Sequence, residues 1–269
     1  MPRPVTDDDD AKGQRPAKAK RPWWKRLLRG LGALLLLIVL GLGITGVVLH
    51  EPRPEGRTGP EAEAMARRMV DAVDGEAWEA LGAVRWRFPR GHRHLWDKRR
   101  GFARVRWDAH EVLLRLSDRS GVARTAGEEV GGEAARELRE KAFALWANDS
   151  FWLNPVVKAF DEGTTRSIVE LEEGGEGLLV SYASGGVTPG DAYLWILDER
   201  GRPVRWRMWV SIIPIGGLGT TWEGWQTLEG GAQVATEHDW GPFTMELTDI
   251  EAAASVEALE GEDPFTELR

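Results

Sequence analysis

Cysteine is absent from this sequence, and tyrosine occurs only as Tyr182 and Tyr193. Without cysteine the chain has no disulfide bonds, thiol nucleophiles, cysteine metal ligands or lipid-modified N-terminal cysteine. The sequence also lacks the G-x-S-x-G, H-E-x-x-H and phosphate-loop motifs of common hydrolases and nucleotide-binding enzymes. No remaining pattern predicts a catalytic centre, so we expect a protein that is not an enzyme.

Surplus positive charge is lacking beyond the first 29 residues. Residues 1–29 carry nine Lys/Arg against four Asp, whereas residues 30–269 carry 26 Lys/Arg against 39 Asp/Glu. Because nucleic acids are bound by basic surfaces, the acidic main part of the chain is not expected to bind them.

Charged side chains are also lacking from residues 31–49, a run of nineteen residues. As a helix this run would extend about 28 Å, close to the thickness of a bilayer core. We therefore predict a transmembrane helix over 27–49 that contacts the lipid bilayer, with Trp23 and Trp24 at the membrane interface. The basic N-terminal flank predicts a single-pass protein of the inner membrane, with a cytoplasmic N-terminus and a periplasmic domain. A cleaved signal peptide is the alternative, although its apolar region is usually only about 7–15 residues long.

The flanking segments differ in composition from the main part of the chain. Residues 1–26 are basic and poor in apolar side chains, which predicts a disordered cytoplasmic tail. Residues 50–60 contain three prolines, which is typical of a stiff spacer. Residues 61–256 are predicted to form one extracytoplasmic domain, and residues 257–269 a flexible acidic tail.

Hydrophobic periodicity predicts an α+β domain. A helix begins near Pro60, short strands lie between residues 84 and 116, and a second helix covers 131–146, followed by a helical piece over 150–160. Further strands are expected from residue 167 to residue 250, and Asp198 to Gly201 form the turn of a hairpin. Both alternating sets of Ala192–Leu197 are apolar, so this strand should be covered on both faces. One strongly curved antiparallel sheet, a β half-barrel wrapped around the helical segments, satisfies this order.

This pattern resembles the LolA/LolB/LppX-type lipoprotein-carrier fold over about residues 60–250. The resemblance is one of architecture, and the missing lipobox cysteine departs from the lipoprotein members of that family. The stretch from Gly185 to Tyr193 is also similar to segments of uncharacterised membrane-anchored bacterial envelope proteins. The resemblance implies a binding protein and no catalytic activity.

Tryptophan and arginine supply the candidate binding residues. Twelve tryptophans follow residue 50, and those on consecutive predicted strands can line an apolar trough for an acyl chain, although filling a closed core is the alternative. Arg-x-Arg pairs flank or adjoin tryptophans at Arg85/Arg87, Arg104/Arg106 and Arg205/Arg207. They form either a solvated outer face or a rim for an anionic head group. The predicted ligand-binding residues are Trp195, Trp206, Trp209, Trp222, Trp225, Arg205 and Arg207.

Two histidine motifs are the other candidates for chemistry. His92 and His94 share one face of a strand, and Asp97, with Asp108 or His110, could complete a metal site. Several arginines and a lysine crowd the same segment, so we interpret it as a polar edge strand and predict no metal and no cofactor. His238 and Asp239 are adjacent in a predicted strand and should point to opposite faces.

These observations predict a domain that binds a lipid, lipoprotein or other amphiphile without catalysis. The alternative is a protein-interaction module of an envelope complex that has no small ligand. That module would use the exposed loops around 185–190 and 214–219.

Overall fold

The structure is a computed structural model. It describes residues 24, 27, 28, 30–32, 34–37 and 46, and the two long stretches 48–184 and 189–268. The chain divides into two compact units, Met1–Val48 and Leu49–Arg269. The predicted disordered tail over 1–26 lies outside the described residues, apart from Trp24.

The predicted transmembrane helix over 27–49 is wrong by the criterion of length and hydropathy. Among the described residues, no helix is both long enough and apolar enough to cross a bilayer. This finding overturns the inner-membrane, single-pass location that was inferred from the helix. The prediction rested on an uncharged run, which meets the composition requirement only. Residues 29, 33, 38–45 and 47 of this stretch lie outside the described residues.

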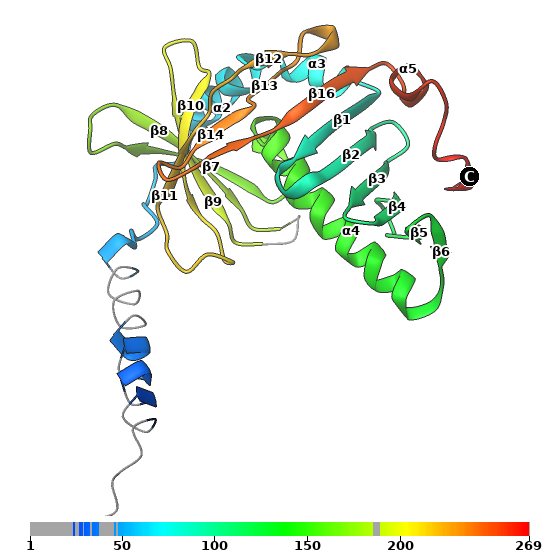
Figure 1. Cartoon of the computed structure of the whole chain (residues 1–269). Coiled ribbons are helices and arrows are strands. Elements are labelled where there is room, and N and C mark those ends of the chain that lie inside the picture. The colour runs from blue at the N-terminus through cyan, green and yellow to red at the C-terminus, as the bar shows by residue number, and fades with distance from the viewer. Residues whose placement is uncertain are drawn as a thin grey trace, which may run out of the picture. The chain divides into compact units, whose positions relative to one another are not determined.

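The second unit contains two large antiparallel sheets (Figure 1). The seven-stranded sheet has the order β16-β1-β2-β3-β4-β5-β6. Its strands are β1 (Ala83–Phe88), β2 (His92–Asp97), β3 (Phe102–Trp107), β4 (His110–Arg115), β5 (Gly121–Thr125), β6 (Glu128–Val130) and β16 (Thr248–Ala253). The sheet thus combines a meander of six consecutive strands with the last strand of the chain.

The five-stranded sheet has the order β11-β10-β9-β8-β7. Its strands are β7 (Thr164–Glu170), β8 (Glu176–Tyr182), β9 (Ala192–Leu197), β10 (Pro203–Trp209) and β11 (Leu218–Thr221). Two short hairpins, β12 (Gln226–Thr227) with β13 (Gln233–Val234) and β14 (Glu237–Asp239) with β15 (Thr244–Glu246), connect this sheet to β16. Asp239 of β14 lies beside β11, because its backbone N–H donates to Thr221 Oγ1 at 3.0 Å.

The helices are α2 (Pro60–Asp71), α3 (Gly75–Ala80), α4 (Gly132–Leu153) and α5 (Val256–Glu260). Four short 3₁₀ turns accompany them in the described part of the chain: η1 (Pro89–Gly91), η2 (Val156–Phe160), η3 (Glu229–Gly231) and η4 (Thr266–Leu268). Pro60 occupies the first turn of α2, where its missing N–H costs no hydrogen bond. Asp74 caps α3 by accepting the Ala77 N–H at 3.0 Å. Helix α4 continues to Leu153 and ends before Pro155, which disfavours helical backbone at Asn154.

Helix α4 connects the cores of the two sheets (Figure 1). Ala135 and Ala142 pack against β3, β4 and β5 of the seven-stranded sheet. Farther along the helix, Phe151 and Trp152 pack into the core of the five-stranded sheet, to which α2 contributes Ala66 and Met69. The C-terminal half of α4 is therefore held by both sheets.

The predicted fold class is right in its α+β content and its antiparallel strands but differs in the sheet. Instead of one half-barrel sheet, the strands form a seven-stranded and a five-stranded sheet. The predicted hairpin is confirmed: β9 pairs with β10, and Asp198 Oδ1 accepts the N–H groups of Arg200 and Arg202 at 2.9 Å each. The first four residues of β9 are buried, as predicted for a strand covered on both faces.

Both ends of the predicted domain differ from expectation. The spacer over 50–60 lies against the five-stranded sheet, where Arg57 exchanges backbone hydrogen bonds with Ile168 at 2.8 and 2.9 Å. The acidic tail over 257–269 was predicted to be loose. Phe265 and Leu268 are instead buried against the outer face of the seven-stranded sheet. Leu259 packs against the same cluster, and Glu260 and Asp263 form ion pairs with arginines of this sheet and its connecting turn.

Candidate functional site

A cavity of about 630 Å³ lies between the C-terminal half of α4 and the five-stranded sheet. Its size is within the range of small-molecule sites, about 300–1,000 Å³. Its apolar lining consists of Phe143, Trp146, Ala147, Phe151, Trp152, Tyr182, Tyr193, Met208, Val210, Ile212, Ile213 and Trp240. We call this space the aromatic cavity.

Aromatic pairs stabilise the walls of the aromatic cavity. Phe151 of α4 lies 5.0 Å from Tyr193 of β9 between ring centroids, and Tyr193 lies 5.8 Å from Tyr182 of β8. Trp152 lies 5.8 Å from Trp240. Such pairs contribute about 0.5–1.5 kcal/mol each beyond their burial, so the wall is preformed by its own packing.

Exposed apolar side chains border the aromatic cavity. Ile212 lines it and has 72% of its surface exposed. Phe243, which is 59% exposed, stacks on the lining residue Trp240 at 5.9 Å. Within the described part of residues 49–268, these two are the most exposed large apolar side chains. An apolar ligand would therefore meet apolar surface before it enters.

The polar lining residues of the aromatic cavity are partly paired with one another. Lys158 contacts Asp161 at 3.3 Å. Asp191 is buried and accepts the Ser211 N–H at 2.9 Å. Burial, together with the charge of Asp191 and a hydrogen bond to it, raises the pKa of Tyr193 above its ordinary value. Tyr193 is therefore a neutral wall residue at physiological pH.

Three hydrogen-bond donors in the lining lack protein partners among the described residues. They are Trp146 Nε1, Tyr182 Oη and Trp240 Nε1. Burial raises the pKa of Tyr182, with smaller contributions from Tyr193 and Asp161, so this phenol also stays protonated. An unsatisfied buried polar group costs about 1–3 kcal/mol. A ligand that brings a carbonyl or carboxylate oxygen to any of these donors would recover that cost.

Three of the predicted ligand-binding tryptophans belong to the closed core. Trp195, Trp206 and Trp222 are 1%, 0% and 2% exposed. Their ring centroids lie 4.8–5.1 Å apart, and none of the three lines the aromatic cavity. Trp206 supports the cavity wall from behind through Tyr193, 4.5 Å away.

The other two predicted tryptophans are half-buried and lie elsewhere. Trp225 donates its indole N–H to the Trp222 carbonyl at 3.2 Å, and Arg202 lies 5.4 Å above its ring. Trp209 donates to the Glu51 carbonyl at 2.8 Å. Neither lines the aromatic cavity.

Arg205 and Arg207 lie on the face of β10 opposite Trp206, as strand alternation requires. Arg205 pairs with Glu173, and Arg207 pairs with Glu51. Because Trp206 points toward the core beside the aromatic cavity, the two arginines are on the far side of the sheet from it. Their charges are balanced by the chain's own carboxylates.

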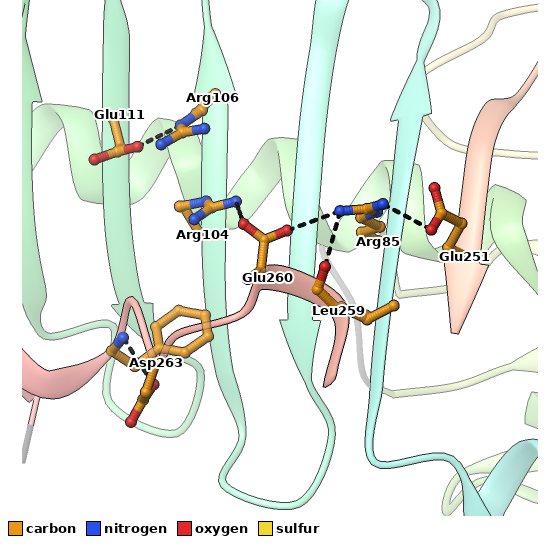
Figure 2. Close-up of polar contacts among 9 residues, drawn as sticks. Arg85, Arg104, Arg106, Glu111, Glu251, Leu259, Glu260 and Asp263 are labelled. Atoms are coloured by element: carbon orange, nitrogen blue, oxygen red, sulfur yellow. Dashed lines mark hydrogen bonds and ion pairs between the residues drawn. The ribbon is translucent and has the colours of Figure 1, made fainter. Parts of the chain in front are cut away.

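The other Arg-x-Arg pairs are likewise matched by acidic residues. Figure 2 shows Glu260 of α5 between Arg85 at 3.3 Å and Arg104 at 2.7 Å. Arg85 also contacts Glu251 at 2.6 Å, and Arg106 contacts Glu111. Arg87 contacts Asp249 at 3.1 Å. The outer face of the seven-stranded sheet therefore carries a network of ion pairs.

The two histidine motifs have different surroundings. His92 and His94 share one face of β2, as predicted, and both contact Asp149 of α4. Asp97 instead contacts Arg100, and His110 contacts Thr125. His238 is fully buried beside Trp222, whereas Asp239 is exposed, which agrees with their predicted opposite faces.

The cavity residues that sequence reasoning missed come mainly from α4 and the loops. Phe151 and Trp152 were expected in a separate short helix after residue 150. Trp240 was expected at the end of a strand but not among the ligand-binding tryptophans. One signal was present in the sequence: its only two tyrosines, Tyr182 and Tyr193, both line the cavity.

Comparison with protein-family models and with curated proteins finds no match to this chain.

Proposed function

We propose that this protein binds an amphiphile, such as a lipid or the lipid moiety of a lipoprotein, with its apolar part in the aromatic cavity. The observation that carries the proposal is a preformed apolar space of about 630 Å³ bordered by exposed Ile212 and Phe243. Lining tyrosines and tryptophans provide apolar surface together with O–H and N–H donors, which suits a ligand with an acyl chain and a polar head.

Binding without chemical conversion is part of the same proposal. The charged lining residues Lys158 and Asp161 pair with each other, and Tyr182 and Tyr193 hold their protons. The architecture of lipoprotein carriers, which the sequence resembles, also places an apolar ligand between a curved sheet and helices. We propose a carrier or sensor of that type rather than a protein-interaction module.

The test is a titration of the full chain with a fluorescent fatty acid, using a variant that fills the aromatic cavity. Ala147 lines the cavity, so Ala147→Trp should weaken probe binding at least tenfold, a loss of about 1.4 kcal/mol. Ala144 is exposed on the same helix and does not line the cavity, so Ala144→Trp is the matched control and should bind like the wild type.

A second variant tests the polar end of the site. Tyr182→Phe removes the unpartnered hydroxyl and keeps the ring. It should weaken binding of the fatty-acid probe while leaving a pure hydrocarbon probe unaffected, with stability unchanged or slightly higher because an unsatisfied group is lost. Absence of probe binding by the wild type, or equal binding by Ala147→Trp and Ala144→Trp, would favour the interaction module.

A further inference from the structure

Two histidines and one aspartate from distant parts of the chain meet between β2 and α4. His92 Nδ1 lies 2.9 Å from Asp149 Oδ2, and His94 Nε2 lies 2.7 Å from the same oxygen. The three atoms that could bind a cation all lie within 4.8 Å of one another. Side-chain exposure is 0% for His94, 1% for Asp149 and 16% for His92.

The Asp149 carboxylate is buried without a lysine or arginine partner among the described residues. Its contacts there are the two imidazoles and the Asn148 side-chain amide, which donates to Oδ1 at 2.9 Å. Elsewhere in this unit, acidic groups of low exposure such as Asp97 and Asp263 pair with Arg100. A buried carboxylate is costly unless a positive charge compensates it. The Asp149 carboxylate therefore lacks the compensating positive charge that Arg100 provides for Asp97 and Asp263.

We propose that His92 Nδ1, His94 Nε2 and Asp149 Oδ2 bind a divalent transition-metal ion of the zinc class. Imidazole nitrogen and carboxylate oxygen are ordinary zinc ligands, and two histidines with one carboxylate form a recurring three-ligand set. At bond lengths of about 2.0–2.2 Å, neighbouring ligand atoms in a tetrahedral site lie about 3.3 Å apart. Separations of 2.7 and 2.9 Å need only small outward rotations of the side chains to accept the ion.

The supports of the three side chains are rigid. The His94 ring stacks on Trp86 with centroids 4.6 Å apart, and the His92 ring stacks on Phe88 at 6.2 Å. The Asn148 amide holds the Asp149 carboxylate from its other oxygen, as groups around metal ligands commonly do. His92 is the one partly exposed member, so a water molecule has access to a fourth coordination position on its side.

The metal site goes beyond the proposed amphiphile binding and does not depend on it. Asp149 points toward β2, while Asn148 and Ser150, its neighbours in α4, line the aromatic cavity. A bound ion would therefore link β2 to the segment of α4 that forms the cavity wall.

The test uses the untagged full chain, treated with a chelator and then titrated with Zn²⁺ by calorimetry. We expect one ion per chain and a rise in the melting temperature with Zn²⁺ concentration. His92→Gln is the preferred variant because His92 is the least buried ligand, and it should weaken binding at least about 100-fold. His110→Gln changes a histidine of β4 that is hydrogen-bonded to Thr125 and lies outside the cluster. It is the matched control and should bind like the wild type.

A spectroscopic measurement on the wild type makes the test independent of variant folding. X-ray absorption of the zinc-loaded chain should show two imidazole rings, with ligand atoms at about 2.0–2.2 Å. Zinc binding with no imidazole in the first coordination shell, unchanged affinity in His92→Gln, or no binding by the wild type would each overturn the metal site. The last result would leave a hydrogen-bonded cluster in which Asp149 accepts from both histidines.

Discussion

Individual tryptophans in this protein divide between a closed core and a ligand wall. Trp206 has no exposed surface and contacts Tyr193, Trp195 and Trp222 at centroid distances of 4.5–4.9 Å. Trp240 lines the aromatic cavity and is only partly buried. Tryptophan residues therefore contribute differently to stability in this protein. The contribution depends on whether the ring is packed on all sides or borders the aromatic cavity.

Truncation of these two residues should separate the roles. Trp206→Ala removes a fully packed ring and leaves a cavity, so it should lower the free energy of unfolding by about 3–5 kcal/mol. Trp240→Ala removes a ring that already borders empty space and should cost clearly less, under about 2 kcal/mol. Denaturant midpoints of both variants provide the measurement. Equal losses would mean that Trp240 is a core residue and that the cavity wall has been misassigned.

His238 is a buried base surrounded by indole rings. Its ring lies 4.4 Å from Trp222 and 5.3 Å from Trp152. Burial lowers the pKa of His238 from 6.5 to about 4, although a hydrogen bond to the Thr221 carbonyl acts in the opposite direction. The folded chain thus keeps this imidazole neutral where the unfolded chain would protonate it.

Stability should therefore fall as the pH is lowered from about 6.5 to about 4. In that window the unfolded state binds a proton at His238 that the native state does not, so acid favours unfolding. The contribution is on the order of 3 kcal/mol and levels off below pH 4, where both states are protonated. Unfolding free energies of the wild type and of His238→Gln, measured across this window, should differ in slope. Parallel pH dependences would show that His238 does not titrate between the two states.

Among the elements, the C-terminal segment of α5 and η4 has the most unexpected role. Its apolar residues Phe265 and Leu268 dock on the seven-stranded sheet, and Glu260 bridges Arg85 and Arg104 (Figure 2). Burial opposes ionisation of Glu260, but its hydrogen bonds and charge interactions with the two arginines outweigh this and lower the pKa of its carboxyl group. An acidic segment is thus complementary to the basic outer face of the sheet.

Glu260→Gln should lower the unfolding free energy by about 1–3 kcal/mol, because it weakens two charge-assisted contacts at a side chain that is only 17% exposed. Glu133→Gln is the matched control. Glu133 also contacts an arginine, Arg136, but both side chains are more than half exposed, and such pairs contribute little, about 0–1 kcal/mol. Chemical denaturation of both variants provides the comparison. Equal effects would reduce the Glu260 bridge to an ordinary surface pair.

The elements that the sequence predicts well are those with a clear local period. The alternation around Trp86, the apolar run Ala192–Leu197, the proline at the start of α2 and the turn at Asp198 are all found where expected. The long-range contacts are the part that local pattern could not provide. The histidine pair of β2 was visible in the sequence, but its partner Asp149 was not, because the packing of α4 on that strand depends on the tertiary fold.

At the scale of the whole molecule, the location of the candidate site also depends on long-range contacts that local sequence pattern does not reveal. Sequence reasoning placed the ligand on the strand tryptophans and the arginines of β10, since these residues cluster along the chain. Folding turns Trp206 into the core and Arg207 toward Glu51 on the opposite face, and it brings α4 over the sheet to create the aromatic cavity. The membrane assignment rested on apolar composition alone, and no helix among the described residues is both long enough and apolar enough to cross a bilayer.

The position of β1 in the seven-stranded sheet has a consequence for how the chain folds as it is synthesised. Ala83 of β1 pairs with Ala253 of β16, and β2 occupies the other side of β1. Until the last strand has left the ribosome, the backbone of β1 has one unpaired edge, and such edges pair readily with other chains. Pairing across this sequence separation also slows folding, because a long loop must close first. Strand β16 therefore protects the edge of β1, which is synthesised early, from misassembly.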